Sequence, residues 1–422
     1  MTNEQNTSAL AGGNDAPITF ANPATQQCPF GAYERLRNSA PVYRDPVTGN
    51  YVLTRYEDVR KAVISASALS SKTGLGSSRD TAAKAELERI YDERGWQPLD
   101  TLISNDPPSH RFYRQLVDRA FTPGKIDELE PRINEIIHDL IDQFIDRPEV
   151  EFVTQFCVKL PMFVIAEQLG VDKRDMDRFK LWSDVSVESQ DPTMTYEREI
   201  ESAKILTDMQ QYMAAAIERL RKEPDGMLLS RLVHAEVDGR NLDLRELMSI
   251  LQQLLVAGNE TTTTTLAAGM KLMLDNPALV GQLRAEPGLM RNFVEETLRI
   301  MSPIQTMFRR ALADVEINGV TIPAGSLVEV RFGAGNRDPE MYRDPACPDL
   351  HRANAGSHLA FGAGRHLCIG NQLARGELRL AFKALIDRLD NFRPSRGEQS
   401  YAYTPLYIAF GLTTLWLNFD KR

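Results

Sequence analysis

The chain has 422 residues, of which 42% are hydrophobic and 25% charged, and its formal net charge is −9. This length and composition allow a core large enough to enclose a cofactor, while the acidity argues against general nucleic-acid binding, which needs a basic surface. The four cysteines form no CxxC pair and are too few for a disulfide framework, so we expect a cytoplasmic protein with free thiols.

The N-terminal segment MTNEQNTSALAGGNDAP lacks the basic and apolar regions of a signal peptide. We therefore expect residues 1–28 to be a flexible lead-in and residues 29–422 to form one domain. The longest apolar stretch, at about 244–274, carries charged and amide side chains that a transmembrane helix would not tolerate, so we expect no membrane anchor.

The first elements mix helix and strand. The patterns predict a helix over 29–38, strands over 41–44 and 50–54, and a helix over 56–65. Between about 70 and 100 the periodicity breaks down and glycine and serine gather at one end, which predicts a long irregular loop that could act as a lid.

The rest of the chain is mostly helical. Residues 107–285 carry repeated proline-initiated helix starts, and a helix over 291–301 ends before Pro303. A final long helix is predicted over 371–389. Short strands separated by NG and PAG turns lie between, at 315–317, 320–322 and 327–330. Because helices and strands do not alternate, the predicted fold class is mainly α with small β-sheets.

One cysteine lies in a glycine-rich loop just ahead of a helix. The segment FGAGRHLCIG occupies residues 361–370, and Cys368 is the third residue from its end. Glycine lets a backbone approach a flat ligand, and a helix N-terminus lowers the pKa of a thiol. A thiolate is an electron-donating axial ligand for haem iron, whereas the plain alternative is a buried cysteine in a turn.

The longest apolar helix has a polar centre, AGNETT at residues 257–262. Polar groups at such a place are unfavourable unless they have a role. Glu260 and Thr261 form an acid–alcohol pair that could pass protons, which O–O cleavage requires, and Gly258 leaves space beside them. Alternatively, the threonines only hydrogen-bond to carbonyls of their own helix.

These two segments resemble motifs of the cytochrome P450 family. Residues 361–370 match its FGxGxHxCxG loop at every fixed position, and residues 257–262 match its AGxETT motif. The resemblance extends from about residue 29 to the end. It implies one triangular, mainly α domain with haem b between the helix of Thr261 and the helix after Cys368, which would ligate the iron. Ala257, Gly258, Phe361 and Gly362 would contact the haem.

The segment ETLR resembles the ExxR signature of the same family. An i,i+3 ion pair of this kind is usually exposed and contributes little to stability. The resemblance instead implies that Glu296 and Arg299 form a buried structural pair bonded to the loop before the cysteine. Arg352, in the segment CPDLHR, is the candidate third member.

An internal haem brings two carboxylates that need cations nearby. His110 and Arg114 resemble the HxxxR clamp of the family, and Arg309 resembles its strand-borne arginine, although Arg310 is adjacent. His366 lies two residues before the cysteine. The resemblance implies that these four side chains, His110, Arg114, Arg309 and His366, bind the haem carboxylates.

The implied activity is a monooxygenase that uses O₂ to hydroxylate, epoxidise or dealkylate a small hydrophobic substrate. Electrons from NAD(P)H would arrive through a separate ferredoxin or flavodoxin-type carrier and its reductase, docking near Arg365 and Arg375 on a monomer. Family analogy places further substrate contacts in the 70–100 loop and at six other positions. These are Gln253, Val256, Gln305, Met307, Leu406 and Ile408.

Three other functions compete with this one. A peroxide-driven peroxygenase needs no electron carrier, but the Glu260–Thr261 pair argues against it, because relatives of that kind typically carry arginine in place of the acid. A non-catalytic haem sensor or carrier would need Cys368 but no proton relay. A zinc protein is the weakest alternative, since no second cysteine or histidine pairs with Cys368.

Overall fold

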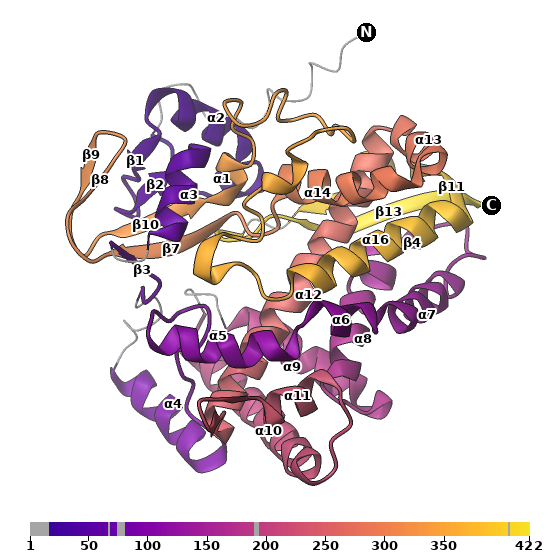
Figure 1. Ribbon diagram of the computed structural model, residues 1–422. Helices are drawn as coiled ribbons and strands as arrows, with labels where there is room; N and C mark the ends of the chain where they lie inside the picture. Colours follow the sequence, from indigo (N-terminus) through magenta and orange to yellow (C-terminus); the bar gives the residue numbers. More distant parts are fainter. Residues whose placement is uncertain (1–16, 66–67, 74–80, 190–193, 404–405) are drawn as a thin grey trace.

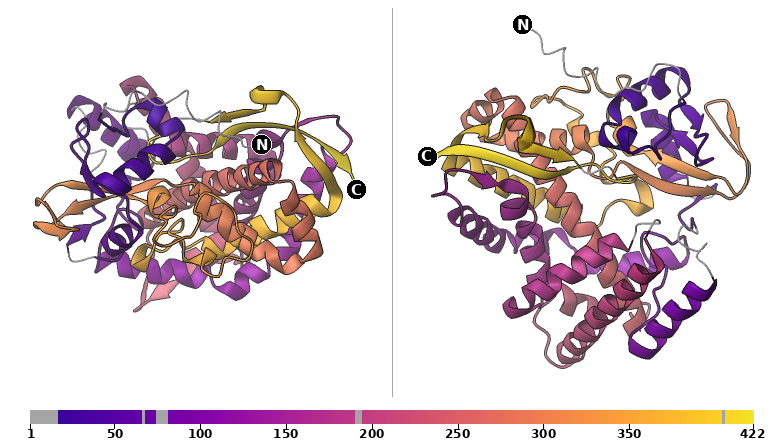
Figure 2. Two further views of the ribbon diagram at one scale, coloured as in Figure 1. Left: turned by 90° about the horizontal axis from the view of Figure 1, so that it is seen from above. Right: turned by 180° about the vertical axis from the view of Figure 1, so that it is seen from behind.

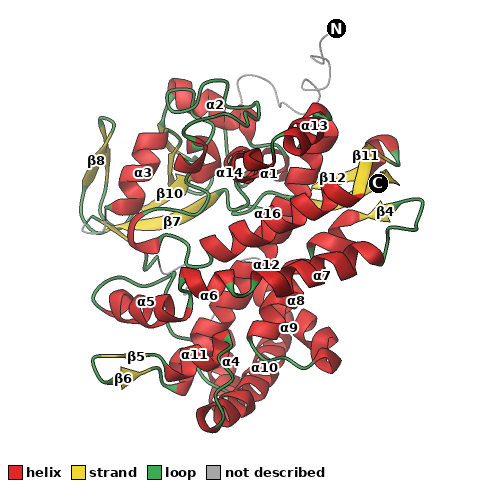
Figure 3. Cartoon of the chain, turned by 45° about the vertical axis from the view of Figure 1, so that its right-hand side comes forward, coloured by secondary structure: helices red, strands yellow, loops and turns green. Residues whose placement is uncertain are grey.

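A long central helix organises the fold. The computed structural model describes residues 17–65, 68–73, 81–189, 194–403 and 406–422, and it is mainly helical with small sheets at the margins, as predicted (Figures 1 and 3). Helix α12 (Leu244–Asp275) runs through the middle and packs against α8, α9, α14 and α16. It begins at a capping box, in which Asp243 and Glu246 each accept the other's backbone N–H.

A five-stranded sheet joins strands from the first 70 residues to strands between Thr306 and Arg331. Its order is β1-β2-β10-β7-β3, with β2 parallel to β10 and all other pairs antiparallel. The predicted Asn318-Gly319 turn connects β8 to β9, and both residues have positive φ, as a two-residue hairpin requires. The strands of this region are β1 (Val42–Arg44), β2 (Tyr51–Leu53), β3 (Leu69–Ser70), β7 (Thr306–Ala311), β8 (Val315–Ile317), β9 (Val320–Ile322) and β10 (Leu327–Arg331).

A second sheet lies at the opposite edge from the β8–β9 hairpin, where the yellow C-terminal strands are seen (Figure 2). Strand β13 is its centre and pairs with β11, β12 and β4. A two-stranded hairpin, β5 with β6, precedes α12. These strands are β4 (Val150–Glu151), β5 (Glu236–Val237), β6 (Arg240–Asn241), β11 (Leu389–Pro394), β12 (Tyr401–Tyr403) and β13 (Leu412–Lys421).

The other helices surround α12 or cover the first sheet. Two large apolar clusters lie on different parts of α12, and both include residues of α8. The helices are α1 (Pro23–Gln27), α2 (Phe30–Ser39), α3 (Tyr56–Ile64), α4 (Thr81–Arg94), α5 (Ser109–Ala120), α6 (Pro123–Asp127), α7 (Glu130–Asp142), α8 (Lys159–Gln168), α9 (Met176–Glu188), α10 (Tyr196–Lys222), α11 (Leu228–His234), α13 (Ala278–Ala285), α14 (Met290–Met301), α15 (Phe332–Gly335) and α16 (Asn371–Arg388). Along the described residues, no helix combines the length and apolar character needed to cross a membrane.

Helix α4 lies within the span that was expected to be an irregular loop. It packs against α10, with Ile90 buried and Arg89 paired to Glu86 and Glu93 on its outer side. The sequence pattern missed it because so few apolar residues mark its buried face. Residues 74–80, which were part of the same prediction, lie outside the described residues.

Part of the predicted lead-in contacts the domain. Residues 1–16 lie outside the described part of the chain, and within residues 17–28 only Phe20 is buried, while most of the others are exposed. Phe20 is buried against Tyr33, with ring centroids 5.4 Å apart, and its backbone N–H donates to Asp45. Asp45 therefore fixes this segment to the turn between β1 and β2.

Candidate active site

The glycine-rich loop holds Cys368 directly ahead of α16. Gly362 and Gly364 have positive φ, and a Cβ on Gly364 would lie only 3.1 Å from Ile64 Cγ2 on α3. The Cys368 N–H donates to the carbonyl of Phe361, and Asn371 Nδ2 donates to the carbonyl of Cys368. The loop is therefore closed on both sides of a free, partly accessible thiol.

The electrostatics at this thiol differ from the prediction. Burial raises the pKa of the Cys368 thiol, and a hydrogen bond from the Gly370 N–H with the charges of Arg114 and Arg375 only partly offsets this. The expectation of a lowered pKa was wrong for the chain alone, because desolvation outweighs the helix N-terminus. A metal cation at the sulfur would provide the missing positive charge, since a coordinating thiol is deprotonated outright.

The middle of α12 faces open space although the helix is central. Ala257 and Gly258 are exposed between buried turns of the same helix, and a Cβ on Gly258 would meet no atom within 4 Å. Helix α16, which follows the cysteine loop, packs against α12. A flat ligand between the two helices would have access to backbone on one side and to the thiol on the other.

The acid–alcohol pair lies in this open segment. Burial raises the pKa of the Glu260 carboxyl, so its neutral, proton-carrying form is favoured. Thr261 Oγ1 donates to the carbonyl of Ala257 at 2.8 Å, which is the local bond that the alternative interpretation predicted. Because the hydroxyl proton is committed to Ala257, the lone pairs of Oγ1 remain free to accept a hydrogen bond. Asn259, which precedes this pair, points to α9, where its Nδ2 donates to Ser183.

A cluster of three basic side chains, His110, Arg309 and His366, lies beside the cysteine loop. The rings of His110 and His366 lie 4.3 Å apart, and Arg309 is nearly fully buried. Burial, then repulsion from His110 and Arg309, lowers the pKa of His366 to about 3, and burial also lowers the pKa of His110 and of Arg309. Arg309 donates to the carbonyl of Phe308, but no carboxylate among the described residues forms an ion pair with it. Asp106 attracts Arg309 without forming an ion pair with it, so the buried guanidinium could still pair with a ligand that carries carboxylates.

Arg114 lies next to this cluster but bonds differently. Its Nε donates to Asp118 at 2.8 Å, and its Nη1 donates to the carbonyls of Arg365 and Leu367. It therefore connects α5 to the cysteine loop in the chain alone. Its place at the loop agrees with a clamp, although its present partners are protein groups.

The cluster is oriented by polar residues that the sequence analysis did not assign to the site, namely Ser70, Ser71 and Asp106. Ser71 Oγ lies 3.0 Å from His366 Nε2, and the Ser71 N–H donates to Asp106 at 3.0 Å. Ser70 also donates to Asp106, whose negative charge acts on both His366 and Arg309. The one available signal was Asp106 itself, which stands four residues before His110 at the start of α5.

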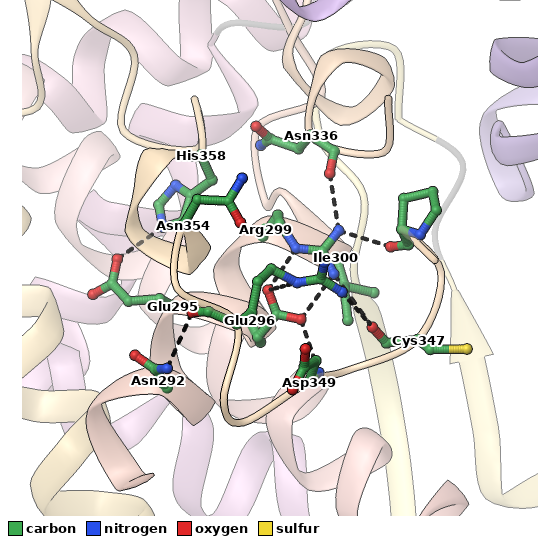
Figure 4. Close-up of polar contacts among 12 residues, drawn as sticks. Asn292, Glu295, Glu296, Arg299, Ile300, Asn336, Cys347, Asp349, Asn354 and His358 are labelled. Atoms are coloured by element: carbon green, nitrogen blue, oxygen red, sulfur yellow. Dashed lines mark hydrogen bonds and ion pairs between the residues drawn. The ribbon is translucent and has the colours of Figure 1, made fainter. Parts of the chain in front are cut away.

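Glu296 and Arg299 form a fully buried bidentate ion pair, with distances of 2.6 and 2.9 Å (Figure 4). Arg352 joins them, because its Nε donates to Glu296 at 3.1 Å. The two guanidinium groups also donate to carbonyls between Asn336 and Cys347. The three charged groups thus fix the segment that leads toward the cysteine loop.

The neighbouring acid, Glu295, holds the cysteine loop itself. Burial alone would raise its pKa, but hydrogen bonds from His358 and Arg375 lower the pKa of Glu295 to about 2. Arg375 also donates to Asn371 at 2.8 Å and stacks on Phe361, 4.4 Å from the ring centroid. Arg375 therefore braces the loop, while its side chain is still 28% exposed, so its role as a contact for an electron carrier stays a prediction.

Two of the predicted substrate contacts have their amides occupied. Gln305 is 2% exposed, accepts a hydrogen bond from Tyr33 and donates to the carbonyls of Met301 and Ser302. Its amide is thus unavailable to a substrate, contrary to the expectation. Gln253 bonds to Thr101 and Ile103, so it fixes the segment after α4.

The remaining predicted contacts are apolar and accessible. Val256, Met307 and Ile408 are partly exposed, and Leu406 is exposed. The connection between β12 and β13 reaches α12, since a Cβ on Gly411 would lie 2.5 Å from the side chain of Thr264. Thr264 is three residues after Thr261, so the C-terminal segment meets α12 close to the open segment.

Known proteins resemble this chain over most of its length. A family model described as Cytochrome P450 matches residues 195–401. Cytochrome P450 107B1 of Saccharopolyspora erythraea is 35% identical over 391 residues, which are 91% of this chain and 93% of that relative. Cyclomarin C epoxidase CymV of Salinispora arenicola is 35% identical, with 88% and 91% of the two chains covered.

Solved structures agree with this chain in fold. Cytochrome P450 CYP109Q5 from Chondromyces apiculatus has a TM-score of 0.85 and 33% identity, with 96% of this chain and 99% of that chain covered. CYP109E1 from Bacillus megaterium in complex with testosterone has a TM-score of 0.81 and 30% identity, with 92% and 99% covered.

Proposed function

The chain belongs to the cytochrome P450 family and is a haem monooxygenase, and we propose that Cys368 is its iron ligand and that Glu260 and Thr261 deliver the protons that its chemistry consumes. The observation that supports this most is the juxtaposition of a free thiol, an open segment of α12 and a buried arginine, Arg309, without an ion-pair partner among the described residues. Because the relatives are monooxygenases, the haem-sensor and zinc interpretations are set aside.

The residues around Cys368 fit haem b. Arg309 would supply positive charge to its carboxylates, His110 and His366 would hydrogen-bond to them, and Arg114 would support them from the loop side. Ala257 and Gly258 would lie along one face, with Phe361 and Gly362 along the other. When bound, the haem iron supplies the redox chemistry that activates O₂, using electrons that come ultimately from NAD(P)H.

The protein's own contribution is to hold and move protons. Burial raises the pKa of the Glu260 carboxyl, which favours the form that carries a proton. Thr261 Oγ1 accepts a proton from the side of Glu260 and passes on its own hydroxyl proton. That hydroxyl now donates to the Ala257 carbonyl. The acid alone or the alcohol alone would leave the relay incomplete.

Electrons would come from a separate ferredoxin or flavodoxin-type carrier with its reductase. Arg365 is exposed on the cysteine loop, and the exposed Leu367 lies beside it. An acidic carrier would be attracted to this positive charge close to Cys368. In this arrangement the protein acts as a monomer with a single catalytic domain.

The substrate is proposed to be a small hydrophobic molecule that is hydroxylated or epoxidised. The accessible candidate contacts, Val256, Met307 and Ile408, are all apolar. One structural relative, CYP109E1 from Bacillus megaterium, was solved in complex with testosterone and with corticosterone, and another relative is named Cyclomarin C epoxidase. Steroids are therefore the first compounds to test for a spin-state shift.

The absorption spectrum of the dithionite-reduced protein with carbon monoxide tests the iron ligand. The wild type is expected to show the strongly red-shifted Soret band of thiolate ligation. Cys368→Ala should lose that band, whereas Cys28→Ala, which changes an exposed cysteine elsewhere, should retain it. A red-shifted band in Cys368→Ala would refute the assignment.

A further inference from the structure

A cavity of about 300 Å³ lies apart from every residue assigned above to haem, protons or substrate. It is bounded by the C-terminal half of α12, the end of α14, residues 346–348 and the last strands of the chain. A volume of this order accommodates a small organic molecule. The residues around it therefore define which molecule would fit.

Three aromatic rings provide an apolar wall. Phe410 lies between Phe30, 5.2 Å away edge-on, and Tyr403, 5.1 Å away and stacked. Ala268 and Met301 add aliphatic surface. A ligand body placed here would contact ring faces and methyl groups, so aromatic or short aliphatic groups suit it.

One cation at this cavity is without counter-charge. Arg337 Nε donates to the carbonyl of Ile300 at 2.9 Å, and the guanidinium lies 3.7 Å from the centroid of the Phe30 ring. Among the described residues, its two terminal nitrogens donate no hydrogen bond and no carboxylate forms an ion pair with it. Burial, with repulsion from Arg299, lowers the pKa of Arg337 to about 10, as expected for a buried cation that lacks an anion.

The other charges that line the cavity neutralise each other. Lys271 Nζ contacts both carboxylate oxygens of Asp275, at 2.5 and 2.6 Å. The wall therefore has one uncompensated positive charge, that of Arg337. An anion of the right size would gain charge-assisted hydrogen bonds from donors that now have no partner.

We propose that this cavity binds a small carboxylate with an aromatic or short aliphatic body, with the carboxylate on the Arg337 guanidinium and the body against Phe30, Tyr403 and Phe410. The site is separate from the proposed haem and substrate sites, so the ligand is an effector or a retained metabolite and is not the molecule oxidised at Cys368. The proposal does not depend on the assignment of Cys368.

Cys347 provides a built-in reporter, because it lines the same cavity and is exposed. The haem-loaded Cys28→Ser protein removes the other exposed cysteine, and Cys157 is buried. The rate at which iodoacetamide alkylates Cys347 is then followed by peptide mass spectrometry, with 4-phenylbutyrate or the matched alcohol 4-phenylbutan-1-ol present. We expect the carboxylate to slow alkylation several-fold at millimolar concentration and the alcohol to have little effect.

Two variants separate charge recognition from general changes. Arg337→Gln should abolish the protection, whereas Arg343→Gln, which removes a 95% exposed arginine close to Cys347 in sequence, should retain it. Ala268→Leu fills the cavity without touching Arg337 and should also abolish protection, which keeps the test decisive if Arg337→Gln does not fold. The spectrum with carbon monoxide should be unchanged in both cavity variants. Equal protection by acid and alcohol, protection that survives Arg337→Gln, or no protection at all would each overturn the proposal.

Discussion

Replacing Arg309 by methionine should have opposite effects on the protein without and with haem. In the chain alone, Arg309 is 5% exposed, makes one hydrogen bond to the Phe308 carbonyl and has no ion-pair partner among the described residues. A buried cation in this state is unfavourable, and an apolar side chain of similar length removes the desolvation penalty. We therefore expect Arg309→Met to raise the free energy of unfolding of the haem-free protein by about 1–2 kcal/mol.

With haem bound, the same substitution should be harmful. A hydrogen bond between a guanidinium and a carboxylate contributes about 1.5–3 kcal/mol, which corresponds to a roughly 10- to 150-fold loss of haem affinity. Transfer of haem to excess apomyoglobin measures this loss, and urea unfolding of the haem-free protein measures the gain. Arg310→Met is the matched control, because Arg310 donates to the carbonyls of Thr73 and Gly325 and should destabilise both forms. Destabilisation of the haem-free protein by Arg309→Met would refute the reasoning.

Three further outcomes follow from the same structure. Glu296→Gln leaves Arg299 and Arg352 buried without their carboxylate, so urea unfolding should show a loss of about 3–5 kcal/mol; a loss below 1 kcal/mol would contradict the buried network. Burial raises the pKa of Glu377 from 4.5 to about 8, so the folded state retains a proton that the unfolded state releases. Stability should fall as pH rises between these two values, and Glu377→Gln should remove that slope in urea titrations at pH 5 and 8. Thr261→Ala should lose product while NAD(P)H consumption continues, as measured by peroxide release; coupled turnover at the wild-type level would exclude a role for this hydroxyl.

The sequence predicted the parts of the site that depend on local spacing. The cysteine loop, the polar centre of α12 and the Glu296–Arg299 pair are short patterns in which neighbours in sequence are neighbours in space. The NG hairpin belongs to the same class, because positive φ at Asn318 and Gly319 is a local property. For these features, little information about the rest of the fold was required.

The failures concern burial and long-range partners. The pKa of Cys368 is raised and not lowered, because the surrounding protein removes water from the thiol and no local pattern shows this. Gln305 was assigned to a pocket, but its partner Tyr33 lies 272 residues away in sequence. Each error would have required knowledge of which elements pack together.

The two consecutive acids of α14 show how such packing determines the position of the cysteine. Successive residues of a helix point about 100° apart, so Glu295 and Glu296 face different neighbours. Glu296 binds Arg299, as Figure 4 shows, and it also binds Arg352, so it fixes the segment that approaches the site. Glu295 binds His358 and Arg375, which flank Cys368 in the chain.

One helix therefore holds the cysteine loop from both ends. The carboxylates are buried, so each can lose its partners only by leaving an uncompensated charge in the interior, and this makes the alternative loop positions unfavourable. The brace acts through the imidazole of His358 on one side of the cysteine and through the Asn371 amide, which donates to the Cys368 carbonyl, on the other. If Cys368 binds the iron as proposed, buried ion pairs remote from its sulfur would set the position of the ligand.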